Sequence, residues 1–364
     1  MTVVLFMIIS PLNSARVGLS ERPGIRSDRK VVNKGCAMNQ KQRFLGTLLG
    51  EGADRFPFFD LEPDEETVEK WHSEGLPRQT SVAEFFDLEN HYSVGLTIRS
   101  FPYFEKAADL LTEPSSFSRH YDPDDPSRCD PVFVERCRRF EREGRVVYVD
   151  ASGGGLLQML GVGDWKSLIA ASVALIEEPL MVADLLNRTT DFYCVCLERV
   201  LSKVPVDYAA FYEPIAANTG PVISPAMFER FAMPGYRKVL GLLEKFHVPL
   251  RIFCTTGGNL TSLLPPLIDA GINGLWISNI LDADMVYGAL RKTFGPGLAL
   301  IGGIDAGALN REEDAMIKTV RETVIPLLEG GRYLPCLDDR PRSNISFARY
   351  QLFRELLEEI AFKM

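Results

Sequence analysis

The feature that most constrains this chain is a regular alternation of short apolar segments with amphipathic ones, from residue 132 to the C-terminus. The apolar segments lack the alternating polar residues of a strand with one solvent-facing side, so they predict parallel strands covered on both faces. At least six such units in one chain favour a closed barrel over an open doubly wound sheet. The expected strands are 145–150, 208–213, 250–254, 274–277, 299–305 and 333–336.

The residues that precede this alternation extend the same architecture. Residues 41–49 have an amphipathic helical pattern, and residues 55–60 read as a short buried strand. No G-x-G-x-x-G motif follows the first strand, which disfavours a dinucleotide-binding sheet. We therefore predict an α/β protein in which residues 38–364 form a single (β/α)8 TIM-type barrel with an N-terminal helical extension.

Residues 1–37 are expected to lie outside the barrel. The apolar run 3–9 is too short to span a bilayer, and the residues that follow it to Lys34 are polar, basic and without periodicity. We expect either a disordered extension or a start-site artefact in which the true start is Met38. A signal peptide is the alternative that this pattern leaves open.

Composition narrows the class of partner. The formal net charge of −9 disfavours nucleic acid, because phosphate binding needs a cationic surface. No apolar segment of membrane-spanning length is present, and the seven cysteines are scattered without a C-x-x-C pair. We expect a cytoplasmic protein that acts on a small-molecule substrate, with no nucleic acid or membrane partner; a homodimer is left open.

Charged and polar side chains recur where the expected strands end. In a (β/α)8 barrel the working residues lie on the loops after the strands, so residues distant in sequence become neighbours there. A carboxylate at a strand end also has a structural explanation, since it can cap the following helix. For Asp305 both roles are open, whereas Pro214 disfavours a normal capping turn after Glu213.

The densest charge cluster at a strand end is the run 338–342, which follows the last expected strand. It could bind a carboxylate, position a polar group or form a structural ion network. We take Glu213, Asp305 and Asp339 as candidate catalytic residues. The candidate substrate-binding residues are Asp150, Tyr212, Asn218, Asp338, Arg340 and Arg342.

Two cysteines also lie at strand ends and raise the question of a metal. Cys254 and Cys336 could share a zinc ion with Glu213 or Asp339, and zinc is the one cofactor that the sequence suggests. All four histidines lie away from the strand ends, and two cysteines alone are a weak metal signature. No Ser-His-Asp or Cys-His arrangement is visible either.

Several motifs together resemble the uroporphyrinogen decarboxylase (URO-D) superfamily in order and spacing. They are Glu213-Pro214-Ile215-Ala216, the segment 220–228, Leu263-Leu264-Pro265, the segment 270–274, the segment 298–305 and the segment 331–338 with 344–347 and Tyr350. The resemblance implies a TIM barrel. It also implies one of two activities: decarboxylation of a tetrapyrrole without a cofactor, or methyl transfer between methylated compounds, corrinoid proteins and thiols.

Departures from the superfamily's motifs decide between these activities. The decarboxylases carry an arginine-rich segment after the first strand, where this chain has the acidic and apolar residues 58–63. The methyltransferases use a His-x-Cys and a last-strand cysteine for zinc; here Cys254 matches, Ile252 replaces the histidine and Asp339 falls at the last position. We expect a methyltransferase-like or uncharacterised branch, with methyl transfer from a small methylated substrate to a corrinoid protein or thiol. The alternatives are tetrapyrrole decarboxylation and a non-catalytic barrel that binds a ligand.

Overall fold

The computed structural model describes residues 38–89, 92–94, 106, 108–109, 114–128, 131–217, 220–255, 257–281 and 284–363. Within these residues, one seven-stranded parallel sheet forms the centre of the molecule. Its strands are β1 (Tyr92–Val94), β2 (Val147–Asp150), β3 (Tyr208–Tyr212), β6 (Leu250–Thr255), β7 (Gly274–Ile277), β8 (Ala299–Gly302) and β9 (Tyr333–Leu334). The expectations for residues 1–37 lie outside the described residues.

The strands neighbour one another in the order in which they occur along the chain, from β1 to β9. A doubly wound sheet would reverse direction at a switch point, so this order is the one expected of a (β/α)8 barrel. Every strand pair in the sheet is parallel, as for Tyr208 opposite Leu250 and Tyr212 opposite Cys254. A separate short hairpin, β4 (Ala216–Ala217) with β5 (Gly220–Pro221), rises from the loop after β3.

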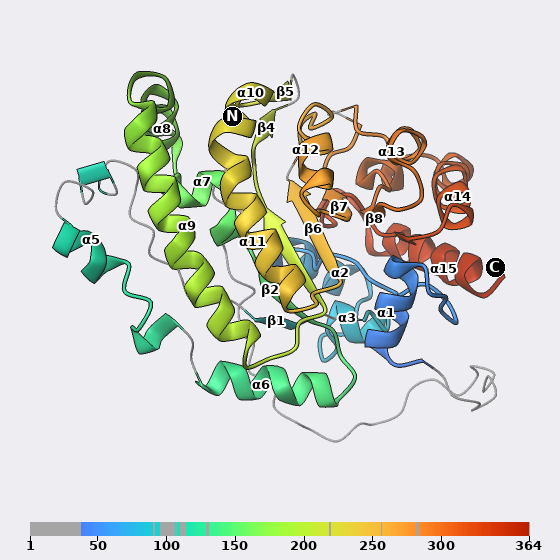
Figure 1. The fold of residues 1–364 in the computed structure, drawn as a ribbon. Helices are drawn as coiled ribbons and strands as arrows, with labels where there is room; N and C mark the ends of the chain where they lie inside the picture. The colour runs from blue at the N-terminus through green and yellow to red at the C-terminus, as the bar shows by residue number, and fades with distance from the viewer. Residues whose placement is uncertain are drawn as a thin grey trace.

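Helices cover the outside of the sheet, with α8, α9 and α11 on one side and α12 to α15 on the other (Figure 1). The helices before β3 are α1 (Gln40–Leu49), α2 (Glu65–Glu74), α3 (Val82–Phe85), α5 (Pro114–His120), α6 (Pro131–Arg142), α7 (Leu156–Met159), α8 (Trp165–Glu177) and α9 (Pro179–Leu201). Those after β3 are α10 (Pro225–Met227), α11 (Met233–Lys245), α12 (Leu264–Asp269), α13 (Tyr287–Phe294), α14 (Glu313–Glu329) and α15 (Phe347–Lys363). The short 3-10 and π segments are Pro126–Arg128, Ser152–Gly154, Phe228–Ala232 and Ala306–Asn310.

Two separate clusters of buried apolar residues show how the sheet divides the core. One packs the sheet against the outer helices. The other contains alternate residues of the strands, such as Tyr148, Tyr208, Ile252 and Trp276, together with Phe44 of α1. Side chains of a strand alternate between its two faces, so the second cluster is the packed interior of the barrel.

The predicted strand at residues 55–60 was wrong as secondary structure, although the segment is buried as expected. It has no strand hydrogen-bond ladder, but it contacts the segments after β9 and before β1: Leu337 N donates to the Asp60 carboxylate and Glu89 N to Phe58 O. The buried Glu89 carboxylate holds the segment instead, through an ion pair with Arg55 and a hydrogen bond from Phe58 N. Phe59 contributes its ring to the barrel interior.

Helix α1 confirms the predicted N-terminal helical extension. Asn39 and Gln42 form a reciprocal capping box at its start, and Gly50 ends it in the left-handed conformation. Its Phe44 ring lies 5.4 Å from the ring of Tyr208, at the start of β3, so the helix closes the amino end of the barrel. In the part of the chain that the structure describes, no helix has the length and apolar character needed to cross a membrane.

Candidate functional site

A polar pocket of about 220 Å³ opens at the carboxyl ends of β7, β8 and β9. It contains five of the residues predicted from sequence, namely Asp305, Asp338, Asp339, Arg340 and Arg342. Asn279, after β7, and Asn344, before α15, add amide groups to its wall. The strand-end rule therefore placed one group of distant residues together correctly.

Asp338 forms the floor that joins the loops of this pocket. Its carboxylate accepts hydrogen bonds from Ala306 N at 2.9 Å and from Ile280 N at 3.1 Å, so it links the segments after β8 and β7. Burial, together with the neighbouring carboxylates of Asp305 and Asp339, raises the pKa of Asp338 to about 6 against the effect of the two amide donors. A carboxyl group with this pKa changes protonation state near neutral pH.

Asp339 and Asp305 are more open than Asp338, and both keep oxygen lone pairs for a ligand. The Asp339 side chain is 19% exposed and pairs with Arg342, whose side chain is 66% exposed. Asp305 caps the short helix Ala306–Asn310 through Gly307 N and contacts Arg311 at 3.1 Å. For Asp305 the capping role is therefore present alongside its place in the pocket wall.

Glu213 lies in a different setting at the end of β3. Its carboxylate is buried, and it accepts hydrogen bonds from Leu156 N at 2.8 Å, Leu157 N at 2.9 Å and the Tyr236 hydroxyl at 2.6 Å. Burial raises its pKa from 4.5 to about 6, against the effect of these donors. Glu213 therefore caps α7 from a distance in sequence and ties it to α11.

Gly155 shows how closely Glu213 approaches the start of α7. A Cβ added at Gly155 would lie 2.2 Å from a Glu213 carboxylate oxygen. The glycine in this loop thus allows the carboxylate to reach the free amides of the helix. Neither Glu213 nor Gly155 contributes to the lining of the β7–β9 pocket.

The remaining predicted residues on this side are also engaged by the protein. The Asp150 carboxylate accepts from Ser152 N at 3.0 Å and from the Ser152 hydroxyl, which in turn accepts from Tyr212 N at 3.0 Å. Tyr148 and Tyr208 stack at 4.7 Å within the barrel interior. Asn218 lies outside the described residues. Asp150, Tyr212 and Cys254 are thus grouped around β2, β3 and β6, apart from the β7–β9 pocket lining.

Cys254 and Cys336 do not make a convincing zinc site. Both thiols are buried, and burial raises the pKa of each well above its usual value, which disfavours the thiolate that zinc requires. Among the described residues, no three His, Cys, Asp or Glu side chains are grouped so as to hold a metal ion. The residues present therefore do not fit a protein-held zinc, and no step below depends on one.

Sequence reasoning missed Asp60, whose carboxylate is buried. It accepts from the Tyr350 hydroxyl at 3.1 Å and lies 3.8 Å from the buried Arg354 guanidinium. Burial raises its pKa to about 6. Asn279 was missed as well, although its place two residues after β7 follows the same strand-end rule. Asp60 also follows this rule, as the last residue of the expected strand 55–60, whereas its partner Tyr350 lies 290 residues away in sequence.

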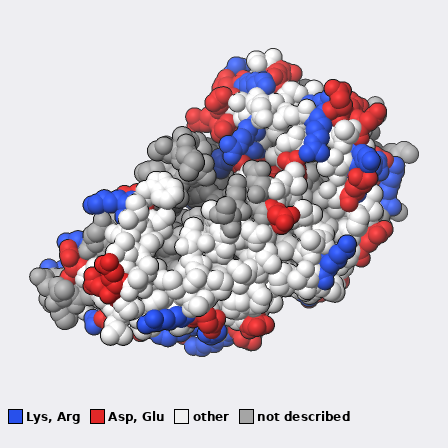
Figure 2. Space-filling model, turned by 90° about the horizontal axis from the view of Figure 1, so that it is seen from above, with Lys and Arg blue, Asp and Glu red and all other residues white. Residues whose placement is uncertain are grey.

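Seen from above, the molecule presents a broad uncharged area with acidic and basic side chains interspersed around it (Figure 2). No field of a single sign dominates this face. Acidic residues outnumber basic ones over the whole chain, at 49 against 40. The charge distribution therefore gives no support to a polyanionic partner on this face.

The family comparison agrees with this architecture. Residues 156–334 match the family model described as uroporphyrinogen decarboxylase (URO-D). Over these residues, which make up just under half of the chain, the sequence is similar to that family. The match runs from α7 to β9 and so includes Glu213, Cys254 and Asp305, while the charge cluster 338–342 lies just beyond it.

Two curated relatives are named uroporphyrinogen decarboxylase. The one from Syntrophotalea carbinolica is 25% identical over 203 residues, which cover 54% of this chain and 55% of the relative. The one from Desulfotalea psychrophila is 33% identical over 100 residues, or 27% of each chain. The chain thus spans about half the length, or less, of the curated relatives it matches.

A solved structure shares the fold over most of the chain. A methyltransferase from Methanosarcina mazei superposes with a TM-score of 0.57 and 15% identity, covering 89% of this chain and 99% of that protein. At this identity the likeness establishes the fold. It confirms the predicted α/β class and the superfamily's barrel architecture.

Proposed function

We propose that this chain is an enzyme that takes a methyl group from a small methylated compound and passes it to a corrinoid protein or a thiol. The observation that carries the proposal is the pocket at the ends of β7, β8 and β9, which brings Asp305, after β8, together with Asp339 and Arg342, after β9. (β/α)8 enzymes work at this end of the barrel. Members of the URO-D superfamily are enzymes, which supports a catalytic use of the pocket.

The size and charge of the pocket favour a small, positively charged donor. Its volume of about 220 Å³ is small beside that of pockets that enclose larger organic ligands, roughly 300–1,000 Å³. Three carboxylates face two guanidinium groups, so a ligand with a cationic or hydrogen-donating group is better matched than one rich in carboxylates. A methylated amine is both small and cationic, whereas a small methoxy compound meets only the size condition.

The proposed reaction needs no protein group beyond those that line the pocket. The acceptor, a thiolate sulfur or the reduced cobalt of a corrinoid, forms a bond to the methyl carbon as the carbon–nitrogen or carbon–oxygen bond breaks. The bonding electron pair stays on the nitrogen or oxygen. A quaternary amine then leaves as a neutral amine, whereas an ether oxygen needs one proton, for which Asp338 has a suitable pKa of about 6.

The test is a donor panel assayed with two acceptors. Purified protein is incubated with tetramethylammonium, trimethylamine or methoxybenzoate and with reduced cobalamin, and methylcobalamin is followed by its absorbance; a thiol acceptor is followed by mass spectrometry. Transfer from a methylated amine, lost in Asp339→Asn, supports the proposal. No transfer from any donor to either acceptor overturns it.

A second candidate is decarboxylation of a tetrapyrrole, which the names of the two curated relatives favour. The pocket volume and the acidic residues argue against a large polycarboxylate substrate. Release of carbon dioxide from uroporphyrinogen would decide for this candidate. If neither reaction occurs and neither Glu213→Ala nor Asp339→Asn alters ligand binding, a non-catalytic binding protein is the remaining explanation.

A further inference from the structure

The charged groups of the β7–β9 pocket are nearly balanced in sign. Its lining contains three carboxylates and two guanidinium groups, which belong to Asp305, Asp338, Asp339, Arg340 and Arg342. A third guanidinium group, that of Arg311, contacts the Asp305 carboxylate at 3.1 Å from outside the lining. A ligand that carries only positive charge would therefore be matched by one half of these groups and opposed by the other half.

The two arginines of the lining differ in what they contact. The Arg342 guanidinium donates to the Asp339 carboxylate, with Nε at 3.2 Å, and that carboxylate also accepts from the backbone N of Arg340 at 2.8 Å. The exposed guanidinium of Arg340 forms no ion pair or hydrogen bond with the residues that the structure describes. Arg340 thus presents an unneutralised, planar set of N–H donors at the pocket, which is the geometry that binds a carboxylate.

One carboxylate outside the pocket also senses the charge of Arg340. Asp64, the N-cap of α2, has its pKa lowered mainly by hydrogen bonds from Thr67, and the charges of Arg340 and Arg342 lower it further. Its side chain accepts from Thr67 N at 2.9 Å and forms no ion pair with Arg340. Asp64 therefore caps its own helix and leaves the Arg340 guanidinium open to a ligand.

We propose that the ligand of this pocket is a betaine, a small zwitterion in which a methylated ammonium group is joined by a short linker to one carboxylate. The inference rests on the proposed function, because it names the class of methylated amine that binds at the same site. The ammonium group lies against Asp305 and Asp339, and Arg340 binds the carboxylate. Leu281, which is 53% exposed in the pocket wall, gives the methyl groups an apolar contact.

Other small ligands match the pocket less well than a betaine. A simple tetraalkylammonium ion would lie beside the Arg340 guanidinium with no negative charge between them. A dicarboxylate would place its second carboxylate against the three acidic side chains. The volume of about 220 Å³ also excludes a long linker between the ammonium and carboxylate groups. A zwitterion with its two charges close together is the ligand that uses both signs of charge in this lining.

The first experiment compares ligands that differ in the carboxylate alone. Glycine betaine, choline and tetramethylammonium are titrated calorimetrically into the native chain; choline has the same trimethylammonium group as glycine betaine, with a hydroxyl group in place of the carboxylate. We expect glycine betaine to bind at least about tenfold more tightly than choline, since a charge-assisted contact is added. Arg340→Gln should remove this preference while its affinity for choline stays within about twofold, because Arg340 is exposed and contacts the carboxylate.

Two further variants identify the group that recognises the carboxylate. Arg340→Lys keeps the charge but not the planar donor set, so it should retain part of the preference. Arg237→Gln is the matched control: Arg237 is 53% exposed on α11, where it pairs with Glu229, and its loss should change no affinity. Circular dichroism confirms that each variant is folded.

Arg342→Gln separates the roles of the two arginines of the lining. Removal of Arg342 leaves the Asp339 charge without its partner, so affinity for choline should rise by about threefold while the preference for glycine betaine remains. Loss of the preference in Arg342→Gln but not in Arg340→Gln would overturn the role given to Arg340.

The outcomes distinguish this inference from the proposed function. If choline and tetramethylammonium bind but glycine betaine binds no more tightly, or if Arg340→Gln keeps the preference, the betaine inference is wrong and a methylated amine remains the proposed donor. If none of the three ligands binds the native chain, both are wrong. A preference for glycine betaine that is present in the native chain and in Arg237→Gln, and is lost in Arg340→Gln, supports the inference.

Discussion

The two sides of the barrel mouth carry acidic residues at equivalent places but use them differently. At the end of β3, Glu213 is buried and its oxygens are taken by two backbone amides and the Tyr236 hydroxyl. After β9, Asp339 is partly exposed and pairs with an exposed arginine of its own loop. The carboxylate at the end of β3 therefore stabilises the fold, because the next helix places its free amides against it. The carboxylate after β9 stays partly exposed to solvent, because its loop leaves it uncovered.

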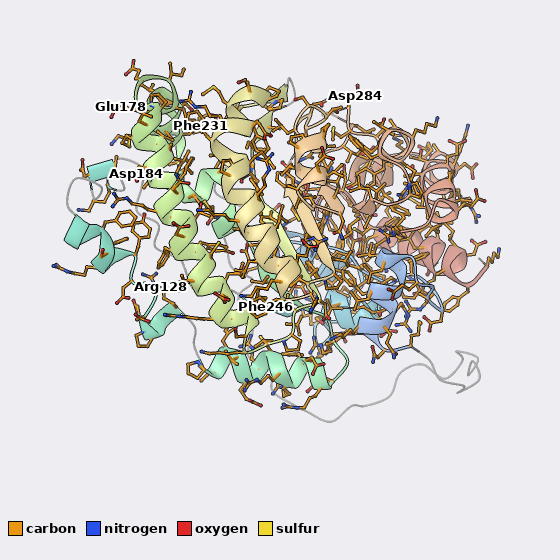
Figure 3. The ribbon with its side chains drawn as sticks, in the orientation of Figure 1. Arg128, Glu178, Asp184, Phe231, Phe246 and Asp284 are labelled. Carbon is orange, nitrogen blue, oxygen red and sulfur yellow. The ribbon has the colours of Figure 1, made fainter. Side chains whose placement is uncertain are left out.

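Glu213→Ala should give the largest effect, and the effect should be on stability. The substitution leaves Leu156 N, Leu157 N and the Tyr236 hydroxyl without an acceptor in a buried region, which we expect to cost about 3 kcal/mol of unfolding free energy. Urea unfolding measures it. Glu178→Ala is the matched control, because Glu178 is exposed at the turn between α8 and α9 and makes no capping hydrogen bond (Figure 3). Equal midpoints for both variants would contradict the structural role of Glu213.

Asp339→Asn should affect activity rather than stability. We expect a loss of about 10- to 100-fold in kcat/KM for methyl transfer, since a charged ligand contact is removed, while unfolding free energy changes by less than about 0.5 kcal/mol. Asp184→Asn removes a similar surface ion pair on α9 and serves as control (Figure 3). The comparison fails if Asp339→Asn destabilises the chain as strongly as Glu213→Ala does.

Asp338 should make stability depend on pH in a predictable direction. Its pKa is raised from 3.8 to about 6, so the folded chain holds a proton that the unfolded chain releases between these values, and stability falls as pH rises from 4 to 6. Asp338→Asn lacks this pH-dependent contribution to the unfolding free energy. Relative to the native chain, its unfolding free energy should rise across that window by up to about 3 kcal/mol.

A carboxylate with the opposite shift provides the contrast for Asp338. The Arg43 guanidinium lowers the pKa of Asp54, so that ion pair contributes stability that is lost as pH falls. The difference in unfolding free energy between Asp54→Asn and the native chain should therefore become smaller as pH falls. If the unfolding free energies of Asp338→Asn and of the native chain change with pH in parallel, Asp338 is not protonated near pH 5.

Cys254→Ala should have the smallest effect. The thiol is buried, burial raises its pKa, and its replacement leaves only a small cavity. We expect activity within about twofold and the same elemental zinc content as the native chain. Stoichiometric zinc in the native chain that disappears in Cys254→Ala would require a metal site at this side of the mouth.

The sequence was sufficient to predict which residues come together on the β7–β9 side of the barrel mouth. The strand ends and the rule that they share one face brought Asp305, Asp338 and Arg342 together, because backbone order alone determines that neighbourhood. It was insufficient for Glu213, because the capping of α7 depends on a contact across 57 residues and on the space left by Gly155. The irregular segment 55–60 shows the same limit: its apolar residues predicted burial, whereas its hydrogen bonds depend on Glu89 and Leu337.

The central claim is that the pocket after β7, β8 and β9 is the ligand site of this barrel. Isothermal titration of tetramethylammonium into the native chain, Asp339→Asn and Asp184→Asn tests it most directly. The account predicts saturable binding to the native chain and to Asp184→Asn, and binding at least tenfold weaker to Asp339→Asn. Equal affinity for all three proteins, or binding that is lost in Glu213→Ala while that variant remains folded, would place the ligand on the other side of the mouth.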